Sequence, residues 1–92
     1  MSYDIEFEEQ FLLDLKRHRK CGNINLLKKI EAFVSELSEH PRTGIGKPEQ
    51  LKGYKAERWS RRIDSKHRLV YEIRDTELIV IAITAYGHYG EK

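Results

Sequence analysis

The fold is decided by residues 58–86, which read RWSRRIDSKHRLVYEIRDTELIVIAITAY. Three segments rich in Val, Ile, Tyr and Trp, at 58–63, 67–73 and 77–86, are separated here by two polar turns of three residues. Such segments favour strands, and connectors this short join antiparallel neighbours. Residues 78–83 are apolar on both sides, which is typical of a central strand partly covered on each face. The stretch therefore predicts three antiparallel strands.

The N-terminal part of the chain adds a short strand and two helices. Residues 3–7 alternate apolar and acidic side chains, the period of a half-buried strand. Residues 8–20 and 24–37 each carry apolar side chains at helical spacing, and Pro41 follows the second helix. Residues 41–48 lack periodicity and are predicted as an ordered loop. The expected fold is α+β, with two N-terminal helices packed on one face of a small, mostly antiparallel sheet, as a single domain spanning residues 1–92.

Composition excludes several classes of protein. With 39% hydrophobic and 35% charged residues, the chain is too apolar to be disordered, and its 92 residues have room for one modest core. No apolar run approaches the ~20 residues that cross a bilayer, and the first residues are acidic rather than basic, so we expect no membrane partner and a cytoplasmic location. Cys21 is the only cysteine and can form no internal disulfide.

Positive charge is concentrated in the middle of the chain. Residues 42–68 hold nine basic and three acidic side chains, a net charge of +6, whereas each flanking part carries −2. A basic segment of this kind attracts polyanions, and contacts with phosphate supply most nucleic-acid affinity. Charge alone is equally consistent with a solvated surface.

The remaining candidates favour chemistry without a metal. The four histidines are scattered, none at helical spacing to another ligand, and the sequence after Gly44 does not match a phosphate-binding loop, so no cofactor or metal is expected. Cleaving RNA without a metal requires a base for the 2′-hydroxyl, cations for the phosphorane and an acid for the leaving oxygen. Suitable residues gather in and around the C-terminal strands: Glu49, Lys52, Trp59, Arg61, Arg62, His67, Arg68, Tyr86, His88 and Tyr89.

Four strings in this region resemble a known family. They are GIGKPEQLK at 44–52, WSRRI at 59–63, HRLVY at 67–71 and the pair His88-Tyr89. Together they resemble the YoeB/Txe branch of the RelE superfamily of toxin–antitoxin ribonucleases, and the likeness covers nearly the whole chain. It implies the RelE-like microbial ribonuclease fold. This chain departs from the family pattern at its end, where Gly87 precedes the His-Tyr pair and residues 90–92 follow it.

The resemblance also implies roles for single residues. Glu49 corresponds to the general base, His88 to the general acid and Arg68 to the arginine that stabilises the transition state. Tyr89 would stack on or position the substrate, with Tyr86 as a second stacking residue. The expected phosphate contacts are Lys52, Arg61 and Arg62.

By the same resemblance, the substrate is messenger RNA in the A site of the ribosome, cut by attack of the 2′-hydroxyl. A YefM-like antitoxin is the expected protein partner, and operator DNA is bound indirectly through it. Two alternatives stay open: a non-catalytic toxin of the RelE/ParE fold, and a plain RNA- or ribosome-binding module.

Simpler interpretations exist for individual residues. Glu49 alone is equally consistent with a solvated loop residue, Arg68 with an exposed strand residue and His88 with a frayed terminus. His67 is interpreted as a turn or packing residue. Trp59 and Tyr71 are interpreted as core residues rather than stacking platforms.

Overall fold

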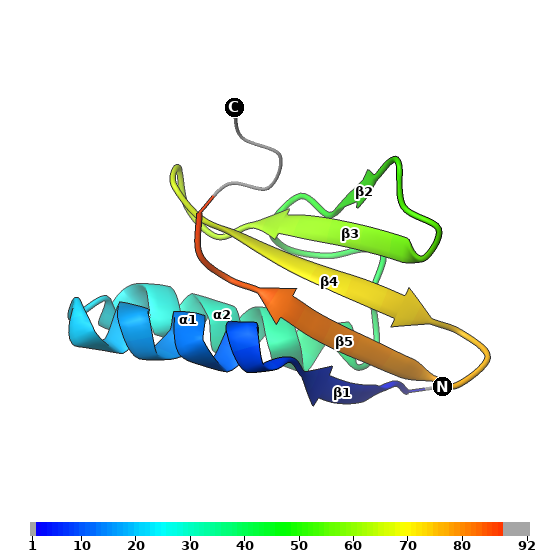
Figure 1. Ribbon diagram of the computed structural model, residues 1–92, viewed down its shortest axis with the longest axis horizontal. Coiled ribbons are helices and arrows are strands. Elements are labelled where there is room, and N and C mark those ends of the chain that lie inside the picture. Colours follow the sequence, from blue (N-terminus) through cyan, green and yellow to red (C-terminus); the bar gives the residue numbers. More distant parts are fainter. Residues whose placement is uncertain (1, 88–92) are drawn as a thin grey trace.

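Two helices and five strands make up the part of the chain that the structure, a computed structural model, describes, residues 2–87 (Figure 1). In chain order the elements are β1 (Asp4–Phe7), α1 (Glu9–Lys20), α2 (Ile24–Leu37), β2 (Glu49–Leu51), β3 (Glu57–Arg62), β4 (Arg68–Arg74) and β5 (Ile79–Thr84). The strands form one sheet in the order β1-β5-β4-β3-β2. The predicted α+β class, with helices first and hairpins last, is confirmed.

The sheet is antiparallel except at one edge. β2, β3, β4 and β5 pair antiparallel with their neighbours, whereas β1 pairs parallel to β5, with Asp4 opposite Ile79 and Phe7 opposite Ala82. β5 is therefore an interior strand, as its two apolar sides predict. It begins at Ile79 rather than at residue 77, because residues 75–78 form a turn in which the Leu78 amide donates to the Asp75 carbonyl.

Both helices lie on the same face of the sheet (Figure 1). Phe11 of α1 and Phe33 of α2 are fully buried against Leu69 and Tyr71 of β4 and Val80 of β5. These strand residues belong to the predicted apolar faces, so burial of their surface accounts for the docking of the helices. Among residues 2–87, no helix combines the length and the apolar character needed to cross a membrane.

One strand was not predicted. Sequence patterning placed a loop up to residue 48 and assigned no element to 49–51, but Glu49–Leu51 forms the edge strand β2. Three residues are too few to show a period of two, and their pairing with β3 depends on the fold of the loop before them. The strand matters for function because it gives Glu49 a fixed place on the sheet.

Candidate functional site on the open face of the sheet

Strand register brings the predicted base and the predicted charge stabiliser to one face. Glu49 of β2 lies opposite Ser60 of β3, while Arg62 of β3 lies opposite Arg68 of β4. Paired residues share a face and alternate residues of a strand share a face, so Glu49, Arg62 and Arg68 all belong to one side of the sheet. Leu69 and Tyr71 are buried on the other side, under the helices. We call the side with Glu49 the open face.

Glu49 and Arg68 are neighbours that hold one another only loosely. Nη1 of Arg68 lies 4.0 Å from Oε1 of Glu49, beyond the distance of a hydrogen bond. The Glu49 side chain is 70% exposed and that of Arg68 is 22% exposed. An ion pair in such a wet setting contributes on the order of 1 kcal/mol or less. Both groups therefore stay available to a substrate.

Positive charge on this face exceeds negative charge at the Arg68 end. Arg62 and Arg68 are directly opposite across β3 and β4, an arrangement of like charges that destabilises a strand pair unless an anion lies between them. Glu49 supplies one negative charge against these two positive charges. Lys52, just after β2, is exposed, as is Arg62. The open face is thus suited to a phosphate, and the predicted phosphate contacts of Lys52 and Arg62 stay predictions.

Arg61 requires a correction. It was predicted to contact phosphate, but its side chain is 0% exposed and its guanidinium is used inside the protein. Nε donates to the Tyr71 hydroxyl and Nη1 binds the Glu36 carboxylate. The other N–H groups donate to the carbonyls of Ile45, His40 and Thr43.

All five N–H donors of Arg61 are therefore occupied, and its role is structural. Its backbone carbonyl acceptors belong to residues 40–45, so Arg61 fastens to the core the loop that leads to Glu49. Tyr71 supports the same loop by donating to the carbonyl of Pro41, 2.6 Å away, and burial raises the pKa of its hydroxyl. Tyr71 is a core residue, as expected, and Trp59 packs partly buried against the core.

At the other end of the open face a second charged group lies on β3 and β4. The Glu72 side chain, 9% exposed, is 2.8 Å from Nε of Arg74 and 3.4 Å from Nε of Arg58. The Arg58 guanidinium lies over the Tyr54 ring, 4.7 Å from its centroid. Sequence reasoning did not single out Arg58 or Glu72, because nothing in the sequence shows that they are opposite one another. Glu77, 3.6 Å from Nη1 of Arg74, adds a second carboxylate, so the charges of this group balance locally, unlike those around Arg68.

The chain that leads to the predicted acid is held next to Arg68. The Gly87 amide donates to Nδ1 of His67, 2.9 Å away, and the Gly87 carbonyl accepts from the Arg68 amide, 3.0 Å away. The predicted acid His88 and the predicted stacking residue Tyr89 lie outside the described residues. Their roles stay predictions.

Tyr86 packs against other side chains of the protein. Its ring stacks on His18, with centroids 4.9 Å apart, and lies 4.6 Å from the ring of His67. The Arg17 guanidinium carbon is 3.7 Å from the centroid of the same ring. These contacts give Tyr86 a place in the structure that the sequence did not indicate. Its stacking on RNA stays a prediction.

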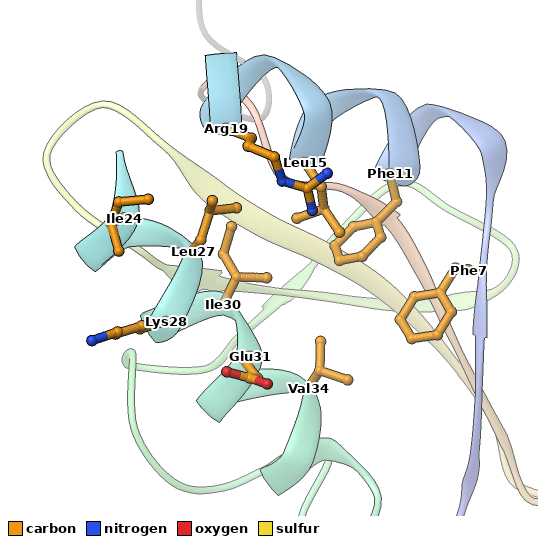
Figure 2. A pocket seen from close by; sticks show the side chains of 10 residues that line it. All are labelled: Phe7, Phe11, Leu15, Arg19, Ile24, Leu27, Lys28, Ile30, Glu31 and Val34. Carbon is orange, nitrogen blue, oxygen red and sulfur yellow. The ribbon is translucent and has the colours of Figure 1, made fainter. Parts of the chain in front are cut away.

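A separate apolar groove lies between the two helices (Figure 2). Phe7, Phe11 and Leu15 form one wall, and α2 forms the other with Ile24, Leu27 and Val34. Its rim carries Arg19, Lys28 and Glu31, but the groove holds no pair of groups suited to acid–base chemistry. Within residues 2–87 there is also no cluster of three His, Cys, Asp or Glu side chains that could hold a metal ion. The open face is therefore the candidate site.

This chain is similar to known proteins over most of its length. A family profile described as "YoeB-like toxin of bacterial type II toxin-antitoxin system" matches residues 7–89. Toxin YoeB of Mycobacterium bovis is 39% identical over 89 residues, covering 97% of this chain and 96% of that protein. Toxin YoeB of Synechocystis is 49% identical over 57 residues, covering 62% of this chain and 66% of that protein. A solved YoeB–YefM complex from Staphylococcus aureus has a chain that superposes with a TM-score of 0.77 at 32% identity, covering 97% of this chain and 100% of its own length.

Proposed function

Because the chain belongs to the family of YoeB-like toxins of bacterial type II toxin–antitoxin systems, we propose that it is an endoribonuclease that cleaves messenger RNA on ribosomes in the cytoplasm. One observation carries the proposal. A carboxylate, Glu49, and a guanidinium, Arg68, lie 4.0 Å apart on the open face, each accessible to a substrate. A base beside a cation is the arrangement that activates a hydroxyl next to a phosphate.

The proposed reaction assigns one step to each group. The Glu49 carboxylate takes the proton from the 2′-hydroxyl, and the oxygen attacks the adjacent phosphorus. Arg68 stabilises the charge that grows on the phosphorane oxygens. The bond to the 5′-oxygen breaks as His88 gives that oxygen a proton. The products are a 2′,3′-cyclic phosphate, which can open to a 3′-phosphate, and a 5′-hydroxyl. Tyr89 orients the substrate, and no step uses a metal.

The family and the positive charge of the open face indicate which partners the protein binds. We propose that the ribosomal A site presents the messenger RNA, whose phosphates meet Lys52 and Arg62 at the positive end of the open face. The S. aureus relative was solved as a complex of YoeB with YefM. We accordingly propose a YefM-like antitoxin as the protein partner of this chain, with operator DNA bound through the antitoxin.

To test the proposal, the purified full-length protein is incubated with ribosomes paused on a defined message, and the ends of the RNA are then mapped. Glu49→Gln keeps the size of the side chain but cannot take a proton, so the single-turnover rate should fall by about 10²–10⁴. His88→Ala should cause a loss of similar size. The matched control is Glu39→Gln, at an exposed carboxylate just after α2, which should cleave at the wild-type rate.

The outcome also separates the alternatives. Wild-type protein that leaves the message intact but still arrests growth when it is expressed in cells would identify a non-catalytic toxin. Binding to ribosomes with neither effect would identify a plain RNA- or ribosome-binding module. Normal cleavage by Glu49→Gln would remove Glu49 as the base, even if the protein is a nuclease.

A further inference from the structure

We propose that His67 is a positioning residue: its imidazole Nδ1, by holding the amide of Gly87, fixes the point from which the chain continues to His88. This proposal rests on the proposed function, in which His88 protonates the leaving oxygen. Sequence reasoning had interpreted His67 as a turn or packing residue. The hydrogen bond from the Gly87 amide gives the His67 ring a more specific role.

Gly87 is held at both of its polar backbone groups by two consecutive residues of the chain. Nδ1 of His67 accepts from the Gly87 amide at 2.9 Å, and the Arg68 amide donates to the Gly87 carbonyl at 3.0 Å. The φ angle of Gly87 is +81°, a region that residues with a side chain rarely adopt. Glycine adopts this region without strain, so the angle by itself does not hold the chain in place. The restraint comes from the two hydrogen bonds.

The restraint is tied directly to the candidate site. Arg68, whose amide holds one end of Gly87, places its own guanidinium 4.0 Å from Glu49. His88 is joined covalently to Gly87, and consecutive Cα atoms are about 3.8 Å apart. Residues 67 and 68 therefore fix Gly87, the last described residue before His88, relative to the base and the cation. A misplacement of about 1 Å of a reacting group can cost roughly 10²-fold in rate.

His67 is itself held firmly enough to serve as an anchor. Its backbone amide donates to the Asp64 carboxylate at 2.7 Å, and its carbonyl accepts from the amide of Ile63 at 3.0 Å. Its ring meets the edge of the fully buried His18, with centroids 4.7 Å apart, and lies 4.6 Å from the ring of Tyr86. His18 in turn lies 2.8 Å, through Nε2, from the carbonyl of Ala85. The residues just before His88 thus rest on a packed group of rings.

The hydrogen bond from Gly87 requires one particular protonation state of the His67 ring. An amide N–H can be accepted only by a ring nitrogen without a proton, so the neutral ring must carry its proton on Nε2. Asparagine offers an oxygen close to the position of Nδ1, whereas leucine fills similar space without an acceptor. The two substitutions separate the hydrogen bond from the packing.

The experiment compares full-length wild type, His67→Leu and His67→Asn, with His40→Leu as a control at an exposed histidine. In His67→Leu, exchange of the Gly87 amide with solvent should accelerate by about 10-fold or more, and single-turnover cleavage on saturating ribosomes should slow by roughly 10- to 10²-fold. Ribosome affinity and Tm should change little. His67→Asn should restore both amide protection and most of the rate, and His40→Leu should match wild type.

Several outcomes would overturn the inference. One is that His67→Leu protects the Gly87 amide from exchange as well as wild type does and cleaves at the wild-type rate. Another is equal loss in His67→Asn and His67→Leu, which would assign the effect to ring packing. Should both variants fail to fold, nitrogen NMR of the wild-type ring at neutral pH still decides, because a proton on Nδ1 contradicts the bond. If wild type does not cleave RNA, the proposed function fails, and Gly87 amide protection alone then shows whether His67 holds the chain.

Discussion

Arg61 and Arg62 are neighbours in the sequence, yet they lie on opposite faces of the sheet and in opposite environments. Arg61 is opposite Leu69 on the helix-covered face, where it is fully buried and all of its N–H groups are bonded. Arg62 is opposite Arg68 on the open face and is exposed. The difference teaches that residue type does not decide whether an arginine binds phosphate. What decides is whether the fold has already used its donors.

The largest effect is expected from removing the buried arginine. Arg61→Met leaves the Glu36 carboxylate, the Tyr71 hydroxyl and several loop carbonyls without their donor, so the free energy of unfolding should fall by about 3–5 kcal/mol. Urea unfolding followed by circular dichroism measures this loss. Arg62→Met, the matched change one residue away, should cost less than about 0.5 kcal/mol. Equal losses in the two variants would contradict the comparison.

Arg68→Ala should have the next largest effect, and on activity rather than stability. Loss of the cation beside Glu49 should slow single-turnover cleavage by roughly 10²–10³, by analogy with other lost donors to a developing charge. Because the ion pair is loose and wet, the free energy of unfolding should change by about 1 kcal/mol or less. Rapid-quench kinetics on programmed ribosomes, with unfolding measured in parallel, provides the check. A rate equal to that of wild type would remove Arg68 from the mechanism.

A smaller effect is expected for Arg62→Ala. If Arg62 contacts one phosphate, its loss should weaken binding to a message-programmed ribosome by a few-fold, equally for all sequences. The dependence of log affinity on log salt should become shallower by about one unit. Titration at four or five salt concentrations measures the slope. An unchanged slope would show that Arg62 does not neutralise a phosphate.

The smallest effect concerns acid stability. Burial raises the pKa of Glu36, but the hydrogen bond from Arg61, the amide of Ile45 and the Arg61 charge together lower it below its ordinary value. A carboxylate with a lowered folded-state pKa stabilises the fold above its unfolded pKa, and this contribution is lost as pH falls through the folded pKa. Glu36→Gln should lower Tm at neutral pH, because the buried Arg61 loses its carboxylate partner. It should also flatten the further decline in Tm below about pH 4.5. An identical decline in both proteins would contradict the assignment.

Much of this architecture could be predicted from local pattern. Both helices and the three C-terminal strands were predicted from periodicity and polar turns, and the helix-covered side of β4 was predicted from the alternation of its residues, although Val70 and Glu72 on its other side are buried too. β2 could not be found, because three residues carry no period and its pairing depends on the loop that Arg61 fastens. The sequence also did not predict that β1 pairs parallel to β5, because a short strand does not specify which distant strand it will pair with.

The site was predicted in part, for a related reason. Family strings pointed to Glu49 and Arg68, which the fold places side by side. They did not distinguish Arg61 from Arg62, because the faces of β3 depend on its register with β4 and not on its own sequence. They also did not predict the role of His67, because its hydrogen bond with the Gly87 amide joins residues twenty positions apart.

The pairing of β1 with β5 has a consequence for synthesis of the protein. β1 is made first, but its only strand partner within the described residues is β5, the last strand to be made, with Asp4 opposite Ile79. A growing chain therefore cannot pair β1 within the sheet until β5, which ends at Thr84, has been made. Gly87 follows β5 in the chain, so its hydrogen bonds to residues 67 and 68 form only after that strand has been made. By this order of events, β1 stays without its strand partner while β2, β3 and β4, which carry Glu49, Arg62 and Arg68, have already been made.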